Sequence, residues 1–311
     1  MNRFTLAIHG GAGTILKKKM TPSLEDAFRK GLQSALDKGF SVLKNGGSSL
    51  EAVKLAVMDL EDNELFNAGR GSVFTNEGSH EMDASIMEGN NLNAGAVGAV
   101  KNIRNPVELA EKIMLQSGHV FLGGEGALEF ARQTGVAIEN DDYFFSKFRF
   151  DQWQKVKDTD TFQLDHTLND PRDKKFGTVG AVACDQFGNL AAATSTGGMT
   201  NKKFGRMGDT PVIGSGTYAN NKTCAISCTG HGEIFLRAVA AYDVSALMEY
   251  KGYSLQEAME EVVNKKLLAM DGEGGMIGVD ALGNSALIFN SDGMYRGIRS
   301  SDGTSAVDIY R

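Results

Sequence analysis

Apolar residues recur every three or four positions in several stretches of the chain, and this spacing predicts helices. The first stretch opens with a capping box between Ser23 and Asp26 and ends at Gly46. The last opens with a second capping box, between Ser254 and Glu257. The predicted helices cover residues 23–45, 48–60, 107–116, 125–134, 233–250 and 254–270.

Shorter apolar runs between glycine-rich turns predict strands. They cover residues 4–8, 72–76, 82–87, 94–100, 178–185, 189–196, 223–229, 276–280, 285–290 and 293–298. Hairpin-type turns join several consecutive runs, so much of the pairing is expected to be antiparallel. Two groups of strands, each with helices nearby in sequence, predict two sheets packed face to face with helices outside them. The expected fold is therefore α+β, a four-layer αββα sandwich, with 1–311 forming a single domain.

Composition limits the classes of partner. The chain has 311 residues, 41% hydrophobic and 23% charged, which is enough to bury a substantial core. The net charge of -7 and the lack of a basic run with interleaved aromatic residues argue against nucleic acid and anionic membranes as partners. No apolar run approaches the roughly 20 residues of a membrane span, and the first apolar run is too short for a secretion signal. The expected location is the cytoplasm.

Cysteine and histidine usage agrees with this expectation. Cys224 and Cys228 fall on one face of a predicted strand, where buried thiols behave as small hydrophobic residues. Disulfides, a zinc site and an organic cofactor are therefore not expected. The five histidines lack metal-ligand spacing, and none is assigned a catalytic or metal-binding role; they are His9, His80, His119, His166 and His231. A contribution of His231 to the shape of its turn is left open.

The junction between Gly177 and Thr178 is the most informative feature of the sequence. The segment 141–177 is charged and is expected to be a mobile surface linker, whereas an apolar strand begins at Thr178. A threonine hydroxyl is a weak nucleophile, but a free α-amine on the same residue can act as its general base. Cleavage before Thr178 would create that amine and divide the chain into 1–177 and 178–311. A linker followed by an ordinary core strand explains the same residues without cleavage.

Other polar residues gather in glycine-rich turns at strand ends, where a ligand can approach the backbone closely. Arg206 and Asp209 lie in one such turn, and as exposed residues they would form a weak surface ion pair. Alternatively they hold the two charges of an amino acid, because arginine matches a carboxylate at two points and aspartate accepts from an ammonium. Thr229 and Gly230, expected at a helix start, can offer a hydroxyl and a backbone N–H to a developing oxyanion.

Seven sequence blocks occur together and in order along nearly the whole chain. They are HGGAG at 9–13, LFNAGRGSVF at 65–74, MDASIMEG at 82–89, GTVGAVA at 177–183, TSTGGMTNK at 194–202, GRMGDTP at 205–211 and TGHGE at 229–233. Through these blocks the chain resembles the plant-type L-asparaginase and isoaspartyl peptidase family of N-terminal nucleophile hydrolases. The fold of that family is an αββα sandwich, which agrees with the layers expected above.

The resemblance implies that the precursor cleaves itself at Gly177-Thr178 through attack of the Thr178 hydroxyl on the preceding carbonyl. The products would be an α chain, 1–177, and a β chain, 178–311. Thr178 would then attack the side-chain amide of L-asparagine or the β-peptide bond of an isoaspartyl dipeptide, forming a β-aspartyl ester that water hydrolyses.

The resemblance also implies roles for other residues of the β chain. Thr196 would hydrogen-bond Thr178 and tune its hydroxyl. Arg206 would bind the substrate α-carboxylate, and Asp209 would bind the α-ammonium. The oxyanion hole would consist of Thr229 and Gly230, the latter also contacting substrate.

In the α chain, the resemblance implies that Asn67 faces the nucleophile and that Gly10 and Gly11 shape the site during autocleavage. It further implies a structural sodium ion bound by backbone carbonyls, which suit a hard cation. The six sodium ligands would be Leu60, Glu61, Asn63, Phe66, Ala68 and Arg70. Family members are dimers of αβ heterodimers, and the same assembly is expected for this chain.

Several alternatives fit parts of the sequence. Glycosylasparaginase shares the nucleophile and the Arg/Asp pair, but Asn-Gly is expected where this chain has Gly197-Gly198, and TGNGD where it has TGHGE. A serine-triad hydrolase lacks support because no G-x-S-x-G motif occurs, and a nucleotide enzyme lacks support because no P-loop occurs. A homologue that binds an amino acid without cleaving itself stays open. So do the preference between asparagine and isoaspartyl peptides and a second alkali-ion site near 113–119.

Overall fold

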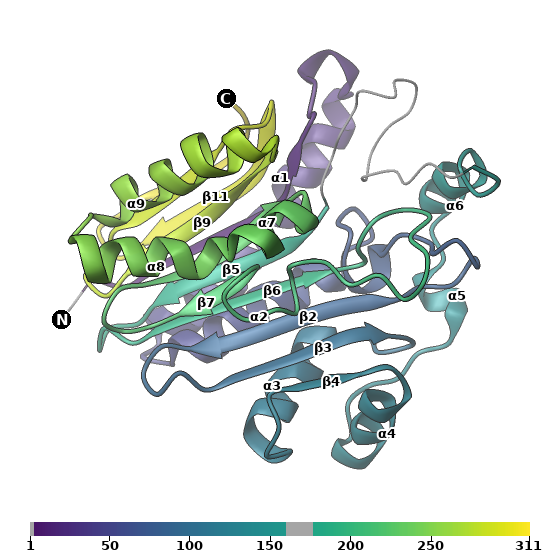
Figure 1. Ribbon diagram of the computed structural model, residues 1–311, viewed down its shortest axis with the longest axis horizontal. Coiled ribbons are helices and arrows are strands. Elements are labelled where there is room, and N and C mark those ends of the chain that lie inside the picture. Colours follow the sequence, from purple (N-terminus) through teal and green to yellow (C-terminus); the bar gives the residue numbers. More distant parts are fainter. Residues whose placement is uncertain (1–2, 160–176) are drawn as a thin grey trace.

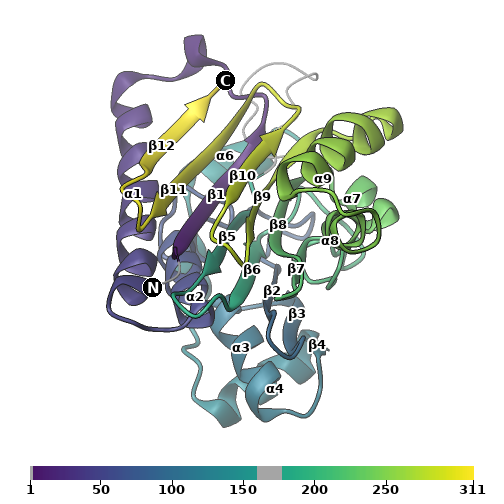
Figure 2. The same cartoon turned by 90° about the vertical axis from the view of Figure 1, so that its left-hand side faces the viewer.

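The computed structural model describes residues 3–159 and 177–311, and Figures 1 and 2 show their arrangement from two sides. Two β-sheets lie against each other, and helices cover the outer face of each sheet. The expected α+β class with two packed sheets is therefore observed.

The larger sheet has eight strands in the order β12-β11-β1-β5-β6-β2-β3-β4. All neighbouring pairs are antiparallel except β3 and β4. The strand that follows Thr178, β5, therefore lies in the middle of the sheet, between β1 and β6. The eight strands are β1 (Thr5–Gly13), β2 (Met82–Glu88), β3 (Ala94–Val100), β4 (Phe121–Gly123), β5 (Val179–Cys184), β6 (Leu190–Thr196), β11 (Gly293–Ser300) and β12 (Ser305–Tyr310).

The smaller sheet is antiparallel and has the order β10-β9-β8-β7. Its strands are β7 (Thr217–Ala219), β8 (Cys224–Gly230), β9 (Gly274–Asp280) and β10 (Ser285–Phe289). The strand β8 packs across β5 and β6 of the larger sheet. Residues far apart in sequence, at the ends of β5, β6 and β8, are thereby brought to one region between the sheets.

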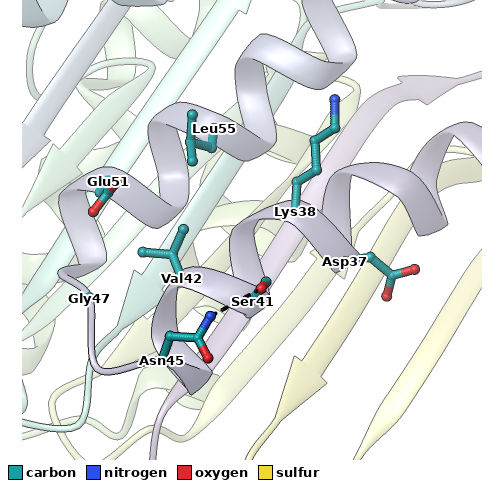
Figure 3. A pocket seen from close by; sticks show the side chains of 8 residues that line it. All are labelled: Asp37, Lys38, Ser41, Val42, Asn45, Gly47, Glu51 and Leu55. Carbon is teal, nitrogen blue, oxygen red and sulfur yellow. Dashed lines mark hydrogen bonds between the residues drawn. The ribbon is translucent and has the colours of Figure 1, made fainter.

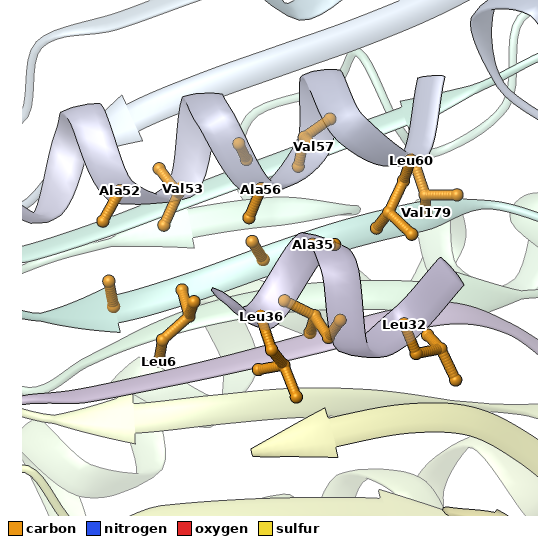
Figure 4. Close-up of a cluster of buried hydrophobic side chains, with 14 of the residues drawn as sticks. Leu6, Leu32, Ala35, Leu36, Ala52, Val53, Ala56, Val57, Leu60 and Val179 are labelled. Carbon is orange, nitrogen blue, oxygen red and sulfur yellow. The ribbon is translucent and has the colours of Figure 1, made fainter. Parts of the chain in front are cut away.

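Helices α1 (Pro22–Lys44) and α2 (Ser49–Glu61) cover the outer face of the larger sheet, and α3 (Pro106–Gln116) and α4 (Gly124–Thr134) continue this layer. Their apolar faces pack on outward-facing strand residues such as Leu6 and Val179 (Figure 4). The cap of α1 differs from the prediction. Thr21 caps the helix and Pro22 occupies its first turn, since proline has no N–H to leave unbonded there.

Helices α7 (Gly232–Ala238), α8 (Ala240–Lys251) and α9 (Leu255–Glu261) cover the outer face of the smaller sheet. The predicted helix 233–250 is interrupted at Val239, whose φ of 50° breaks the helical geometry between α7 and α8. The capping box at Ser254 is confirmed. The predicted helix 254–270 is α-helical only through α9 and continues as a wider π-type turn (Val262–Leu267) and a 3-10 turn (Leu268–Met270).

The interface between the two sheets changes character along its length. One end is apolar and holds buried residues such as Ala7, Val182, Ala225, Ile277 and Val279. The other end holds the buried polar side chains of His9, Thr178, Thr194, Thr196, Ser227 and Thr229. Because unpaired buried polar groups are costly, this polar end marks the region where a function is expected.

The strand predicted at 72–76 is not formed. Its backbone instead bonds to loops, since Thr75 N–H donates to Ser79 O at 2.8 Å and Asn76 N–H donates to Lys202 O at 2.9 Å. Local alternation of side chains could not reveal these loop partners. The sequence also carries no strong signal for three strands at sheet edges or in short pairings, namely β4, β7 and β12.

Part of the predicted mobile linker is ordered structure. Residues 141–159 contain α5 (Asp141–Phe144) and α6 (Lys147–Gln154). Arg149 of α6 is fully buried, and its guanidinium donates to Gly71 O at 2.9 Å and to Leu65 O at 3.4 Å. These contacts attach the helix to the loop before β2. The rest of the linker, 160–176, lies outside the described residues.

Candidate active site

Thr178 lies immediately before β5 at the polar end of the sheet interface, and its side chain is buried. Its hydroxyl donates to Oγ1 of Thr196, at the end of β6, over 3.2 Å. The N–H of Gly198 donates to the same oxygen over 3.0 Å. Two donors on Thr196 Oγ1 fix the direction in which the Thr178 hydroxyl proton points, which leaves the Thr178 oxygen lone pairs free for attack.

Asn67 holds the turn that follows Thr196. Its amide donates to Gly198 O at 2.8 Å, its side-chain oxygen accepts from Val73 N–H at 3.0 Å, and its backbone oxygen accepts from Gly197 N–H at 2.9 Å. A Cβ on Gly197 would lie 2.4 Å from Asn67 Oδ1, so only glycine fits there. The structure thus places Asn67 beside the nucleophile turn, as expected, with its bonds directed to the turn rather than to Thr178.

The carbonyl of Thr178 contacts a histidine that sequence reasoning left without a role. His9 Nδ1 lies 3.0 Å from Thr178 O, and Nε2 lies 2.9 Å from Ser227 Oγ. Burial lowers the pKa of His9 to about 3, so the ring is neutral, and it donates to the Thr178 carbonyl when its one proton is on Nδ1. The HGGAG block could have indicated His9, because it precedes two glycines in a strand.

Gly10 and Gly11 form an irregularity in β1, where the register with β11 shifts between His9 and Ala12. A Cβ on Gly10 would lie 2.4 Å from the ring of Phe66, and Gly11 has a φ of 112°, which strains any other residue. These glycines let the strand bend close to the Phe66 loop beside Thr178.

Arg206 does not pair with Asp209. It forms a two-point ion pair with Glu233, with Nε to Oε1 at 2.9 Å and Nη2 to Oε2 at 3.0 Å. Sequence reasoning missed Glu233, although it ends the TGHGE block. The pair uses one side of the guanidinium, and Nη1 carries no bond to another described residue.

Asp209 is buried, and its Oδ2 has no hydrogen-bond partner in the described part of the chain. Burial raises the pKa of Asp209 to about 7, with the Arg206 charge opposing the shift. A Cβ on Gly232 would lie 2.8 Å from Arg206 Nη2 and 2.9 Å from Asp209 Oδ1. The two side chains therefore meet at the backbone of Gly232, and the orphaned carboxylate oxygen of Asp209 can accept from a donor.

Thr229 and Gly230 end β8 rather than starting a helix, since α7 begins at Gly232. Thr229 is fully buried, and its Oγ1 accepts from the N–H of Ala12 at 3.3 Å, which ties this strand end to the bend in β1. The hydroxyl, the Gly230 backbone and Gly232 thus lie along one strand–turn–helix connection beside the Arg206 and Asp209 side chains.

The predicted sodium loop follows α2. The loop backbone packs closely on itself, because a Cβ on Gly69 would lie 2.5 Å from Glu61 O and a Cβ on Gly71 would lie 2.0 Å from Phe66 O. The carbonyls of Leu60, Asn63, Phe66 and Ala68 each accept one backbone N–H, which leaves a second lone pair on each. Neutral carbonyl oxygens with a lone pair to spare are the donor type that a hard cation takes. No group of three His, Cys, Asp or Glu suited to a metal occurs in residues 3–159 and 177–311.

A groove of about 670 Å³ lies elsewhere, between α1 and α2 (Figure 3). It is open, and its lining includes Lys38, Ser41 and Glu51. None of the sequence-predicted site residues lines it. The described helices include none long and apolar enough to cross a membrane.

The chain matches known proteins along nearly its whole length. Residues 2–309 match the asparaginase family model. The chain is 50% identical to a Salmonella typhimurium protein named isoaspartyl peptidase, with both chains covered completely. It is 49% identical to an Escherichia coli protein of the same name over all of this chain and 97% of the relative. A Xenopus laevis protein named isoaspartyl peptidase/L-asparaginase is 42% identical over 93% of this chain and 90% of the relative.

The family match and these relatives define a hydrolase of amide bonds. The chain belongs to the asparaginase family, whose members act on small-molecule substrates.

Proposed function

We propose that the chain cleaves itself between Gly177 and Thr178 and then hydrolyses L-asparagine and β-aspartyl dipeptides. The observation that carries the proposal is the buried Thr178 hydroxyl, bonded to Thr196 at the junction of linker and central strand. The names of the bacterial and amphibian relatives support the two substrate classes.

The maturation step uses the Thr178 hydroxyl as nucleophile. Its oxygen attacks the carbonyl carbon of Gly177, the C–N bond of the peptide breaks, and the nitrogen becomes the α-amine of Thr178. Water hydrolyses the resulting ester, which leaves a carboxylate on Gly177. The Thr178 amine then acts as general base for the same hydroxyl during turnover.

In turnover, Thr178 Oγ1 attacks the β-carbonyl carbon of the substrate, and ammonia or an amino acid leaves with a proton from the amine. Water, deprotonated by the amine, then hydrolyses the β-aspartyl ester to give aspartate and the free hydroxyl. Arg206 binds the α-carboxylate and Asp209 binds the α-ammonium. The oxyanion of each tetrahedral intermediate accepts hydrogen bonds from the Thr229 hydroxyl and the Gly230 N–H.

We infer four further properties, the first three from the same relationship. The fold is the four-layer αββα sandwich of N-terminal nucleophile hydrolases, and the assembly is a dimer of αβ heterodimers. A sodium ion, bound by the carbonyls of the loop 60–70, stiffens the segment that carries Asn67. A cytoplasmic location is supported by three cysteines that are all buried and free.

Two measurements test the proposal. Intact-mass spectrometry of purified protein should find chains of residues 1–177 and 178–311, and cleavage at any other bond would contradict the assignment of Thr178. Release of ammonia from asparagine and of amino acid from a β-aspartyl dipeptide should both appear in the cleaved protein. A chain that stays whole and binds aspartate without turnover would favour the amino-acid-binding alternative. Activity on glycosylated asparagine would favour the glycosylasparaginase-like alternative.

A further inference from the structure

A line of buried side chains crosses from the nucleophile to the substrate-binding turn. Each member is fully buried at the polar end of the sheet interface, and each contacts the next through a polar atom. We call this line the buried relay, and its members are His9, Ser227, Thr194, Thr217 and Ser85.

The relay begins at the carbonyl of Thr178, which His9 Nδ1 contacts at 3.0 Å. His9 Nε2 contacts Ser227 Oγ at 2.9 Å, and Ser227 Oγ contacts Thr194 Oγ1 at 2.7 Å. A Cβ on Gly180 would lie 2.0 Å from Ser227 Oγ and 2.5 Å from His9 Nε2. Because Gly180 of the GTVGAVA block has no side chain, it leaves room for the contact between His9 and Ser227 between the sheets.

The relay ends at the turn that carries Asp209. Thr217 Oγ1 donates to Thr194 Oγ1 at 2.5 Å, and Ser85 Oγ donates to Thr217 Oγ1 at 2.7 Å, so both protons point toward the His9 end in this structure. Ser85 Oγ in turn lies 2.6 Å from the carbonyl of Thr210, the residue after Asp209. Among the described residues the relay branches at Thr194, which also donates to Gly216 O at 3.3 Å, a carbonyl that already accepts a backbone N–H.

Counting protons shows that the relay has several arrangements, because one contact must lack a proton and this gap can lie at any position along the line; the two with the gap at an end differ most. Four hydroxyls and one N–H of a neutral imidazole supply five protons, whereas the line from Thr178 O to Thr210 O contains six contacts. One contact therefore lacks a proton. If His9 donates through Nδ1 to Thr178 O, every hydroxyl can point toward His9 and the contact at Thr210 O is empty. If every hydroxyl points toward Thr210 O, His9 carries its proton on Nε2 and Thr178 O loses its donor.

We propose that the buried relay is a hydrogen-bond switch that couples occupation of Asp209 by an ammonium group to the orientation of Thr178. This inference rests on the proposed function for the role of Asp209. A cation at Asp209 attracts the negative end of each O–H dipole of the relay. It therefore favours the order in which the hydroxyl oxygens face Thr210 and the hydroxyl protons face His9. That order places Nδ1–H of His9 on the Thr178 carbonyl and fixes the peptide plane from which the nucleophile projects. The relay members are thus positioning residues, which never touch substrate.

The test reads the tautomer of His9 by nitrogen NMR of cleaved enzyme labelled with ¹⁵N-histidine, with the signals assigned through their loss in His9→Asn. L-aspartate, which has the α-ammonium, should shift His9 toward protonated Nδ1, whereas succinate, which lacks it, should not. Thr217→Val removes one hydroxyl and interrupts the relay, so it should abolish the response to L-aspartate. His9 can then donate to Thr178 O, and Ser85 to Thr210 O, whatever the charge at Asp209. Thr217→Ser keeps the hydroxyl and should respond like the wild type.

The matched control is Thr223→Val, which removes a buried hydroxyl bonded to Ser245 and lies outside the relay. It should respond like the wild type, so a general effect of losing a buried hydroxyl is separated from the relay. An unchanged His9 signal in wild-type enzyme that binds L-aspartate by calorimetry overturns the proposal. So does a full response in Thr217→Val.

A second arm needs no ligand and separates this proposal from the proposed function. At a pH above the pKa of Asp209, Asp209→Asn removes a negative charge from the same end of the relay. It should shift His9 toward protonated Nδ1 in the wild-type background and have no effect on His9 in the Thr217→Val background. Failure of L-aspartate to bind contradicts the proposed function alone, whereas equal His9 signals with and without the Asp209 charge overturn the relay.

Discussion

Glu233 accepts two hydrogen bonds, of 2.9 Å and 3.0 Å, from one side of the Arg206 guanidinium, and Nη1 is left without a bond to a described residue. The Glu233 carboxylate is half exposed, whereas Arg206 is mostly buried. The acid therefore orients the arginine from the solvent side, with Nη2 beside Gly232 and Asp209 and Nη1 beside Gly208.

The first prediction concerns the ion pair between Glu233 and Arg206. Glu233→Gln should raise KM for asparagine about tenfold, or about 1.4 kcal/mol, with little change in kcat. An amide can accept only one of the two N–H groups, so Arg206 loses its fixed orientation. The substitution also removes the repulsion between the Glu233 carboxylate and the substrate carboxylate, which acts to lower KM. This effect is the smaller one, because solvent screens the charge of the half-exposed Glu233.

Steady-state kinetics of Glu233→Gln beside the exposed control Glu249→Gln checks this expectation. A lowered KM in Glu233→Gln would mean that Glu233 competes with substrate for Arg206 instead of orienting it.

The second prediction concerns the nucleophile. Thr178→Ala should show neither cleavage at residue 177 nor turnover, because no other hydroxyl takes its place. Thr178→Ser should retain slow cleavage, since it keeps the oxygen but loses the methyl group that restricts χ1. Denaturing electrophoresis over time measures both, and two chains from Thr178→Ala would disprove the assignment.

The third prediction concerns pH. Burial raises the pKa of Asp209 to about 7, and an ammonium can bind only after the proton leaves. The affinity for L-aspartate should therefore rise as the pH rises through about 7, with release of a proton on binding. Calorimetry in buffers of different ionisation enthalpy detects that proton, and a pH-independent affinity would contradict the role of Asp209.

The raised pKa of Asp209 also predicts how the free energy of unfolding depends on pH. Its folded pKa lies above the ordinary aspartate value, so the contribution to folding is fully present at low pH and is lost as the pH rises through about 7. Asp209→Asn should remove this loss, and its unfolding free energy should exceed that of wild type more at pH values above about 7 than below about 4. Denaturant unfolding of uncleaved Thr178→Ala, with and without the second change, measures it.

The fourth prediction concerns Arg149. Arg149→Met should lower the free energy of unfolding by about 3 kcal/mol, because it leaves the buried Gly71 carbonyl and the part-buried Leu65 carbonyl without a charged donor. The exposed Arg132→Met should change stability by less than about 0.5 kcal/mol. Equal midpoints for the two variants would show that α6 does not hold the loop.

The sequence by itself determined the elements whose signals are local. Helical spacing located α1 and α2, alternation and turns located β5 and β6, and the order of the glycine-rich blocks indicated the family. Thr178, Arg206 and Asp209 could all be named from residue chemistry, since a hydroxyl at a linker end and an Arg/Asp turn each suggest one kind of partner.

The tertiary structure alone decided which residues meet. It paired Arg206 with Glu233, left the Oδ2 atom of Asp209 without a hydrogen-bond partner among the described residues, and turned the predicted strand 72–76 into a loop. Each outcome depends on atoms far away in sequence. The path from Thr178 through His9 to Thr210 exists only where the two sheets pack, and the hydroxyls along it look like ordinary strand residues until packing removes water from around them.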